Sequence, residues 1–157
     1  MTPWLLATSA LACGLMGGTF FAFSSFVMPA LSRIPTEEGI RAMQRINVDV
    51  YHWTFMGTFL LTPVLCIATA LQAYRGGNEQ VALLAIVGCT VYVAGNFFVT
   101  AGGNVPLNND LAALDATTVE AARGWTRYLS NWTRWNHVRT AASMIAAACF
   151  VLALRSL

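Results

Sequence analysis

The sequence predicts an all-α membrane protein: four transmembrane helices in an up-down-up-down bundle, with two polar loops containing short helices on one side. Of its 157 residues, 57% are hydrophobic and 10% are charged, whereas soluble domains carry about 25% charged residues. The mean hydropathy is +0.58. The few charges also cluster between long uncharged stretches. We therefore expect one integral membrane domain over residues 1–157, and this composition gives no basis for nucleic-acid binding.

The uncharged stretches have the length that a bilayer requires. They cover residues 1–32, 50–74, 80–109 and 140–154. The hydrocarbon core takes about 20 residues of helix. A soluble four-helix bundle would need a polar stripe on every helix, and the second and third stretches have none. The predicted transmembrane helices cover about 4–28, 50–74, 80–101 and 136–155.

The first stretch reads as a transmembrane helix and not as a cleaved signal peptide. No basic residue precedes the apolar stretch, which continues beyond the usual length of a signal sequence. Gly14 and Gly18 lie four residues apart, a spacing that lets helices approach closely in membranes.

The two long connections are expected to contain helices of their own. Thr36 followed by Glu37 and Glu38 is typical of a helix start, which predicts a helix over about 37–48. After the third transmembrane segment, the paired glycines and Pro106 in residues 102–109 predict that the helix ends. A further helix is expected from about 117 to 132, with the option of continuing into the fourth segment.

Arginine counting predicts the orientation. The first and third loops carry three arginines each, whereas the opposite side carries only Arg75 and Arg155. Loops rich in arginine stay in the cytoplasm. We therefore expect a bacterial inner-membrane protein with loops 1 and 3 cytoplasmic.

The fourth uncharged stretch is too short to cross a bilayer alone. Its 15 residues make about 22 Å of helix, against a core of about 30 Å. The span therefore draws Asn136, His137 and Arg139 to the membrane boundary. An ionisable group there is costly unless it faces the protein interior or an aqueous cavity. The alternative is an Arg139 side chain that extends to the lipid headgroups.

Helical geometry places the polar end of this segment on the same face as an aromatic stripe. At 100° per residue, the members of the stripe fall within an arc of about 100°. Such a face is suited to a flat aromatic ligand with an oxyanion; the alternative is an aromatic belt at the bilayer interface. The six residues are Trp125, Tyr128, Trp132, Trp135, Asn136 and Arg139.

His52 and His137 are the only histidines. In the predicted topology they lie at a similar depth, so that a haem or a metal held by both is one alternative. His137 lies away from the aromatic stripe, and no carboxylate is adjacent to it. Polar interfacial histidines are the simpler interpretation, and we predict no cofactor.

Amide side chains gather at the end of the third segment. Asn104 and Asn108 lie there, and Asn47 lies on the helix before the second segment. Amides donate and accept hydrogen bonds without a change of charge. These residues either bind a phenol and its carbonyl or build a turn.

Four motifs in this order resemble the anthrone oxygenase family of small four-helix membrane proteins. They are GTFFAFSSFVMPAL at 18–31, QRIN at 44–47, NVPLN at 104–108, and W-x6-W-x2-WNHVR at 125–139. The resemblance covers essentially the whole chain. It implies oxidation of a polycyclic phenolic compound, an anthrone to an anthraquinone, with O2. The family supplies no settled catalytic residues.

Such chemistry requires a base, an oxyanion stabiliser and a stacking wall. The candidate bases are His137 and His52, and the candidate stabilisers are Arg139, Asn136, Asn104 and Asn108. The candidate substrate-binding residues are Trp125, Tyr128, Trp132, Asn47 and Phe23.

The sequence leaves open whether the protein is an enzyme. The leading hypothesis is an oxygenase that acts on a lipophilic aromatic small molecule. The expected partners are this small molecule and membrane lipid, and a homo-oligomer is a further option. The alternatives are a redox protein that binds haem or a metal through His52 and His137, and a non-enzymatic membrane accessory subunit.

Overall fold

The computed structural model describes residues 3–157, and every element assigned within that range is a helix. The α-helices alternate with short π-helical segments, labelled η. In chain order the elements are α1 (Pro3–Ala22), η1 (Phe23–Val27), α2 (Met28–Leu31), α3 (Thr36–Asp49), α4 (Trp53–Arg75), α5 (Glu79–Tyr92), η2 (Val93–Phe98), η3 (Thr100–Asn104), α6 (Val105–Ala112) and α7 (Val119–Arg155). The prediction of an all-α fold is confirmed.

Four continuous helical stretches are long and apolar enough to cross a membrane. The number agrees with the prediction, but three of the four are longer than expected, because helical structure continues into the loops. The stretches are Pro3–Leu31, Trp53–Arg75, Glu79–Ala112 and Val119–Arg155.

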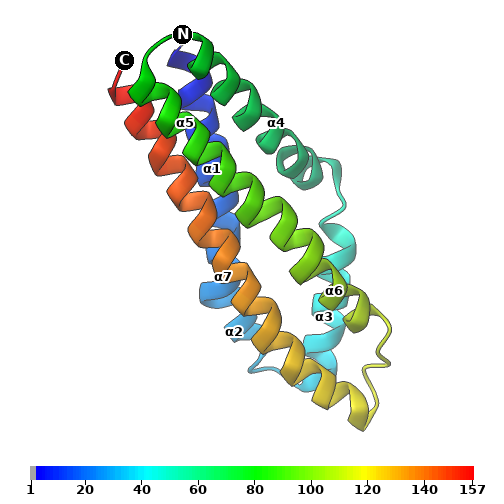
Figure 1. Cartoon of the computed structure of the whole chain (residues 1–157). Coiled ribbons are helices and arrows are strands. Elements are labelled where there is room, and N and C mark those ends of the chain that lie inside the picture. Colours follow the sequence, from blue (N-terminus) through cyan, green and yellow to red (C-terminus); the bar gives the residue numbers. More distant parts are fainter. Residues whose placement is uncertain (1–2) are drawn as a thin grey trace.

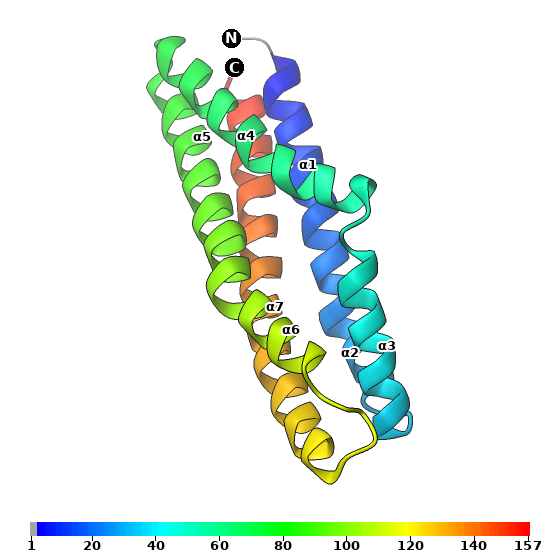
Figure 2. The same cartoon turned by 90° about the vertical axis from the view of Figure 1, so that its right-hand side faces the viewer.

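The long helices lie alongside one another, and both chain ends lie at the same end of the molecule as the turn between α4 and α5 (Figures 1 and 2). α3, α6 and the first half of α7 gather at the opposite end. With 37 residues, α7 is about 55 Å long, well beyond a hydrocarbon core of about 30 Å. The segments predicted as polar loops therefore form a helical extension.

The helix starts in this extension follow the sequence signals. α3 begins at Thr36, and Glu37 and Glu38 occupy its first turn, where the helix dipole favours acidic groups. α7 begins after Thr118, whose hydroxyl accepts a hydrogen bond from the Ala121 N–H at 3.2 Å. α7 then continues without interruption into the fourth span, which is one of the two outcomes that the sequence allowed.

The predicted helix end after the third segment is wrong. The helix continues through Gly102 and Gly103 because the chain widens into the π-helical segment η3, whose last bond joins the Val105 N–H to the Thr100 carbonyl. Pro106 then falls in the first turn of α6, directly after the π-helical segment, and its fixed φ is compatible with a helix.

The glycines that allow close helix packing are also not the predicted pair. A Cβ added at Gly14 or Gly18 would have no neighbour within 4 Å. A Cβ at Gly17 would instead lie 3.0 Å from the Cβ of Ser143 on α7, and one at Gly95 would overlap the side chain of Ala142. α1 and the α5–η2 helix therefore pack closely on α7.

The core has two parts. The cluster toward the chain termini includes Phe20, Tyr92 and Phe150. The cluster in the helical extension includes Met43 and Trp132. Between the two clusters lies the cavity described next.

Candidate functional site

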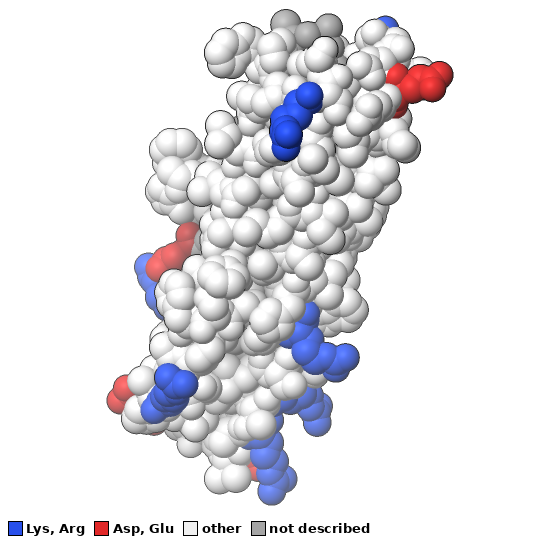
Figure 3. Space-filling model, turned by 90° about the vertical axis from the view of Figure 1, so that its left-hand side faces the viewer, with Lys and Arg blue, Asp and Glu red and all other residues white. Residues whose placement is uncertain are grey.

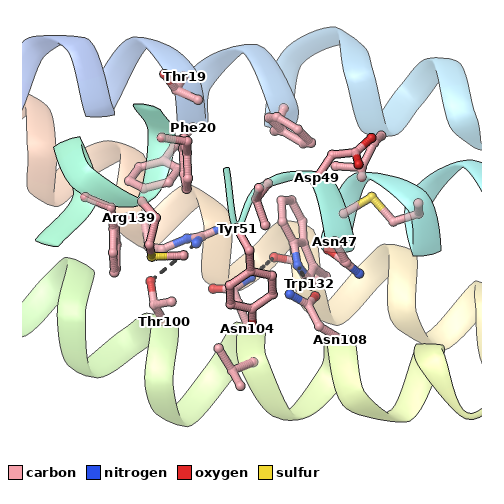
Figure 4. Close-up of a pocket in the computed structure, with 18 residues that line it drawn as sticks. Thr19, Phe20, Asn47, Asp49, Tyr51, Thr100, Asn104, Asn108, Trp132 and Arg139 are labelled. Carbon is pink, nitrogen blue, oxygen red and sulfur yellow. Dashed lines mark hydrogen bonds between the residues drawn. The ribbon is translucent and has the colours of Figure 1, made fainter. Parts of the chain in front are cut away.

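A cavity of about 350 Å³ lies where the two core clusters meet, bordered by Phe20 of the first and by Met43 and Trp132 of the second. Residues from α1, η1, α3, α4, η3, α6 and α7 line it (Figure 4). Its wall is mainly apolar. The polar lining residues are Thr19, Asn47, Asp49, Tyr51, Thr100, Asn104, Asn108 and Arg139.

Arg139 supplies a buried positive charge to this cavity. Its side chain is 6% exposed. Nη2 donates to Asn136 Oδ1 at 2.6 Å, and Nη1 donates to Thr100 Oγ1 at 3.3 Å. The guanidinium carbon lies 4.3 Å from the centre of the Phe20 ring and 5.2 Å from that of Trp132. Arg139 is therefore sheltered inside the protein and does not extend to the headgroups.

Within residues 3–157, no acidic residue forms an ion pair with this guanidinium. The ion pairs among residues 3–157 join Arg41 to Glu37 and Arg45 to Asp49, all four on α3. Arg139 Nε has no hydrogen-bond partner although it is buried. A buried, uncompensated cation is unfavourable by itself, and charge-assisted hydrogen bonds to an oxyanion or a carbonyl oxygen would relieve it.

Asn136 holds Arg139 in place and ties α7 to the first helix. The residue is fully buried. Its Nδ2 donates to the Phe20 carbonyl and to Ser24 Oγ, both at 2.6 Å. Ser24 belongs to η1, and the Phe20 carbonyl lies just before it. A side-chain donor is thus inserted at a π-helical segment, a feature that recurs at functional sites.

Asn104 presents an acceptor. Its Nδ2 donates to the Trp132 carbonyl at 3.2 Å, which fixes the amide, while its buried Oδ1 has no partner. Asn104 and Arg139 both line the cavity, and each has one buried polar atom without a partner among the described residues.

Asn108 has both of its acceptor positions occupied. Its Oδ1 accepts from the Tyr128 hydroxyl and from Trp132 Nε1, both at 2.9 Å. Asn47 Nδ2 donates to the same Tyr128 hydroxyl at 3.4 Å. These bonds connect α3, α6 and α7 around the end of the cavity.

The aromatic stripe of α7 is interior. Trp125 and Tyr128 stack with ring centres 5.6 Å apart, and Tyr128 and Trp132 stack at 6.3 Å. All three are buried, so they do not form an interfacial belt. Only Trp132 among them lines the cavity. Trp135, at the edge of the predicted arc, is 44% exposed.

The two histidines stand apart from this site. His52 caps the start of α4, where Nδ1 accepts from the Thr54 N–H at 3.5 Å. His137 is exposed on α7. Neither lines the cavity, whereas Asp49 does. Within residues 3–157 there is no group of three or more His, Cys, Asp or Glu side chains placed to hold a metal ion.

The structure adds residues around the site that the sequence did not indicate. Thr100 and Ser24 bind the Arg139–Asn136 pair, and Phe20 lies under the guanidinium. Phe55 and Phe59 of α4 contribute a further apolar wall. No pattern within one segment identifies these residues, because each is defined by a partner on another helix. Phe23, one of the candidate substrate-binding residues, also lines the cavity.

Four apolar helices around a buried polar centre define the chain as an integral membrane protein. Residues 49–149 match the family model described as anthrone oxygenase, and the chain belongs to that family. The match includes α4 to α6 and most of α7, and so it contains Asn104, Asn136 and Arg139. No curated protein and no solved structure matches the chain in the corresponding comparisons.

Proposed function

We propose that the protein is an enzyme that oxidises a lipophilic polycyclic phenol with O2 in this cavity. One observation carries the proposal: the uncompensated guanidinium of Arg139, buried against Phe20 and Trp132 with Nε unpartnered. An anionic aromatic ring system would accept a charge-assisted hydrogen bond from Arg139 while its rings contact the aromatic wall.

The size and polarity of the cavity support a ligand of this class. A volume of about 350 Å³ lies at the lower end of the range of about 300–1,000 Å³ for small-molecule sites. Four of its polar lining residues, Thr100, Asn104, Asn108 and Arg139, lie on η3, α6 and α7, and Phe55 and Phe59 of α4 add apolar surface. A flat, apolar molecule with oxygen atoms on one edge matches this distribution.

The reaction of an anthrone requires no external reductant. A base removes one proton from the methylene carbon, and the electron pair moves toward the carbonyl oxygen, where Arg139 stabilises it. The anion gives one electron to O2, and the two radicals combine to form a carbon–oxygen bond. The resulting peroxide takes up the proton. Loss of water, with the second methylene hydrogen, then leaves the new carbonyl of the anthraquinone.

Asp49 is a suitable proton acceptor at the edge of the cavity. It is the carboxylate among the described lining residues. Arg45 holds its two oxygens, with Nη2 3.0 Å from Oδ1 and Nε 3.1 Å from Oδ2. His52 and His137 remain the alternative bases, although neither lines the cavity.

We further propose that the arginine-rich helical extension faces the cytoplasm of a bacterial cell, since cytoplasmic segments of inner-membrane proteins are enriched in basic residues. The cavity would then lie near the cytoplasmic boundary of the bilayer. A lipophilic substrate at that depth could be supplied from the membrane.

The experiment is an O2-uptake and absorbance assay of the detergent-purified protein with 1,8-dihydroxyanthrone, corrected for the reaction without protein. Wild type should form the quinone with one O2 consumed per quinone. Arg139→Gln should lower kcat/KM by about 10²–10³-fold, as expected for loss of an oxyanion donor. Arg127→Gln, an exposed arginine of the same helix, is the matched control. Equal rates for Arg139→Gln and wild type, or no rate above background, would overturn the proposal.

A further inference from the structure

A second, smaller pocket of about 160 Å³ lies on the outer side of α7, away from the cavity. It is lined by Asn131, Arg134, Trp135 and Val138. These residues follow the spacing i, i+3, i+4 and i+7, which places them on one face of the helix. The pocket therefore combines a guanidinium, an amide, an indole and one apolar side chain.

The polar groups of this pocket have no partners within the described part of the chain. Arg134 takes part in neither of the two ion pairs, and neither it nor Trp135 has a side-chain hydrogen bond in residues 3–157. The Trp135 ring is nevertheless fixed in position. A Cβ added at Gly103 would lie 2.8 Å from it, so the ring packs directly on the backbone of η3.

The pocket lies at the level where the surface changes from charged to apolar. On the side toward the α7 N-terminus, the exposed residues include Arg123 and Arg127. On the other side they include Met144 and Ile145. Figure 3 shows basic side chains gathered toward one end of the molecule and an uncharged surface beyond them, up to the charges near the opposite end.

The length of α7 places this level at the bilayer boundary. Residues 138–155 make about 27 Å of helix, which matches a hydrocarbon core of about 30 Å. With the end at Arg155 on one boundary, Arg134 lies at the depth of the lipid phosphates on the other.

We propose that this pocket binds the phosphate of an anionic phospholipid. The Arg134 guanidinium and the Trp135 indole N–H donate to the phosphate oxygens, the Asn131 amide faces the headgroup, and an acyl chain lies along Val138. Arginine and tryptophan are suited to this task because a guanidinium pairs with phosphate and an indole lies stably at the interface. This site is separate from the proposed oxidation, since none of its four lining residues lines the cavity.

The test is native mass spectrometry of the detergent-purified full chain titrated with phosphatidylglycerol or with phosphatidylcholine of the same acyl chains. Wild type should retain phosphatidylglycerol preferentially. Arg134→Gln should weaken its binding about tenfold, the loss of one charge-assisted contact. Arg123→Gln is the matched control, because it is an exposed arginine on the same face, about 16 Å farther from the bilayer, and it should change binding less than twofold.

Three outcomes would overturn the proposal. Equal losses in Arg134→Gln and Arg123→Gln would indicate diffuse attraction to the basic extension. Equal retention of the two lipids would indicate that the pocket does not recognise the anionic headgroup. Displacement of the lipid by millimolar inorganic phosphate would identify a site for the free ion. Thermal unfolding of both variants verifies that each is folded.

Discussion

Asn136 Oδ1 accepts a hydrogen bond of 2.6 Å from Nη2 of Arg139, three residues farther along the same helix. Because Asn136 Nδ2 simultaneously donates to the Phe20 carbonyl and to Ser24, the guanidinium is positioned by a residue that is anchored on another helix. The buried charge is thus held in one direction, toward the cavity, before any ligand binds.

Replacing this anchor should reduce both stability and activity. Asn136→Ala leaves the Phe20 carbonyl, Ser24 and Arg139 each without one partner, and we expect a loss of about 1–3 kcal/mol in the free energy of unfolding. Unfolding in mixed micelles measures it. Asn109→Ala is the control, since the Asn109 side chain is exposed. If the two variants unfold alike, the anchoring role of Asn136 is incorrect.

The histidines should be dispensable for turnover. Neither His52 nor His137 lines the cavity, so the double variant His52→Ala/His137→Ala should retain most of the wild-type kcat. Removing a general base would instead lower kcat by about 10²–10⁴-fold. Asp49→Asn, measured in the same O2-uptake assay, should show a loss of that kind in kcat with little change in KM. If the histidine double variant lost activity and Asp49→Asn did not, a histidine would be the base.

The close contact of η2 with α7 should make Gly95 sensitive to substitution. Gly95→Ala places a methyl group into the side chain of Ala142, and overpacking of this kind costs about 1–3 kcal/mol. Gly18→Ala has nothing within 4 Å of the new group, and it should be neutral or stabilising by up to about 1 kcal/mol, since alanine is the better helix former. Thermal midpoints in detergent compare them; a drop for Gly18→Ala as large as that for Gly95→Ala would contradict the packing described here.

The shared acceptor on Asn108 should couple Tyr128 and Trp132. Asn108→Leu leaves two buried donors unpaired, each at a cost of about 1–3 kcal/mol. Tyr128→Phe removes one of those donors, so the double variant should lose less stability than the sum of the two single variants. A double-mutant cycle measures this difference, and additive losses would show that the 2.9 Å bonds contribute no coupling.

The sequence alone was sufficient for the features that depend on one segment at a time. The spacing of charges identified four membrane-crossing helices, because a bilayer excludes charge over a fixed length. Helical periodicity placed Trp125, Tyr128, Trp132, Asn136 and Arg139 on one face of α7, and all five are buried. Trp135 lies at the edge of this arc and is partly exposed, and periodicity does not predict the contact of its ring with the backbone at Gly103.

Which side chains face one another across helices follows from the packing of the helices and not from any one segment. Phe20 under Arg139, Thr100 beside it and Asp49 at the cavity are far apart in the chain, and their proximity follows from how α1, η3 and α3 pack on α7. In the same arrangement both histidines are exposed, and the third helix continues through Gly102 and Gly103. Local patterns fix the conformation of a helix and its apolar face. The partner of that face is selected by the shape and polarity of distant surfaces, which no single segment specifies.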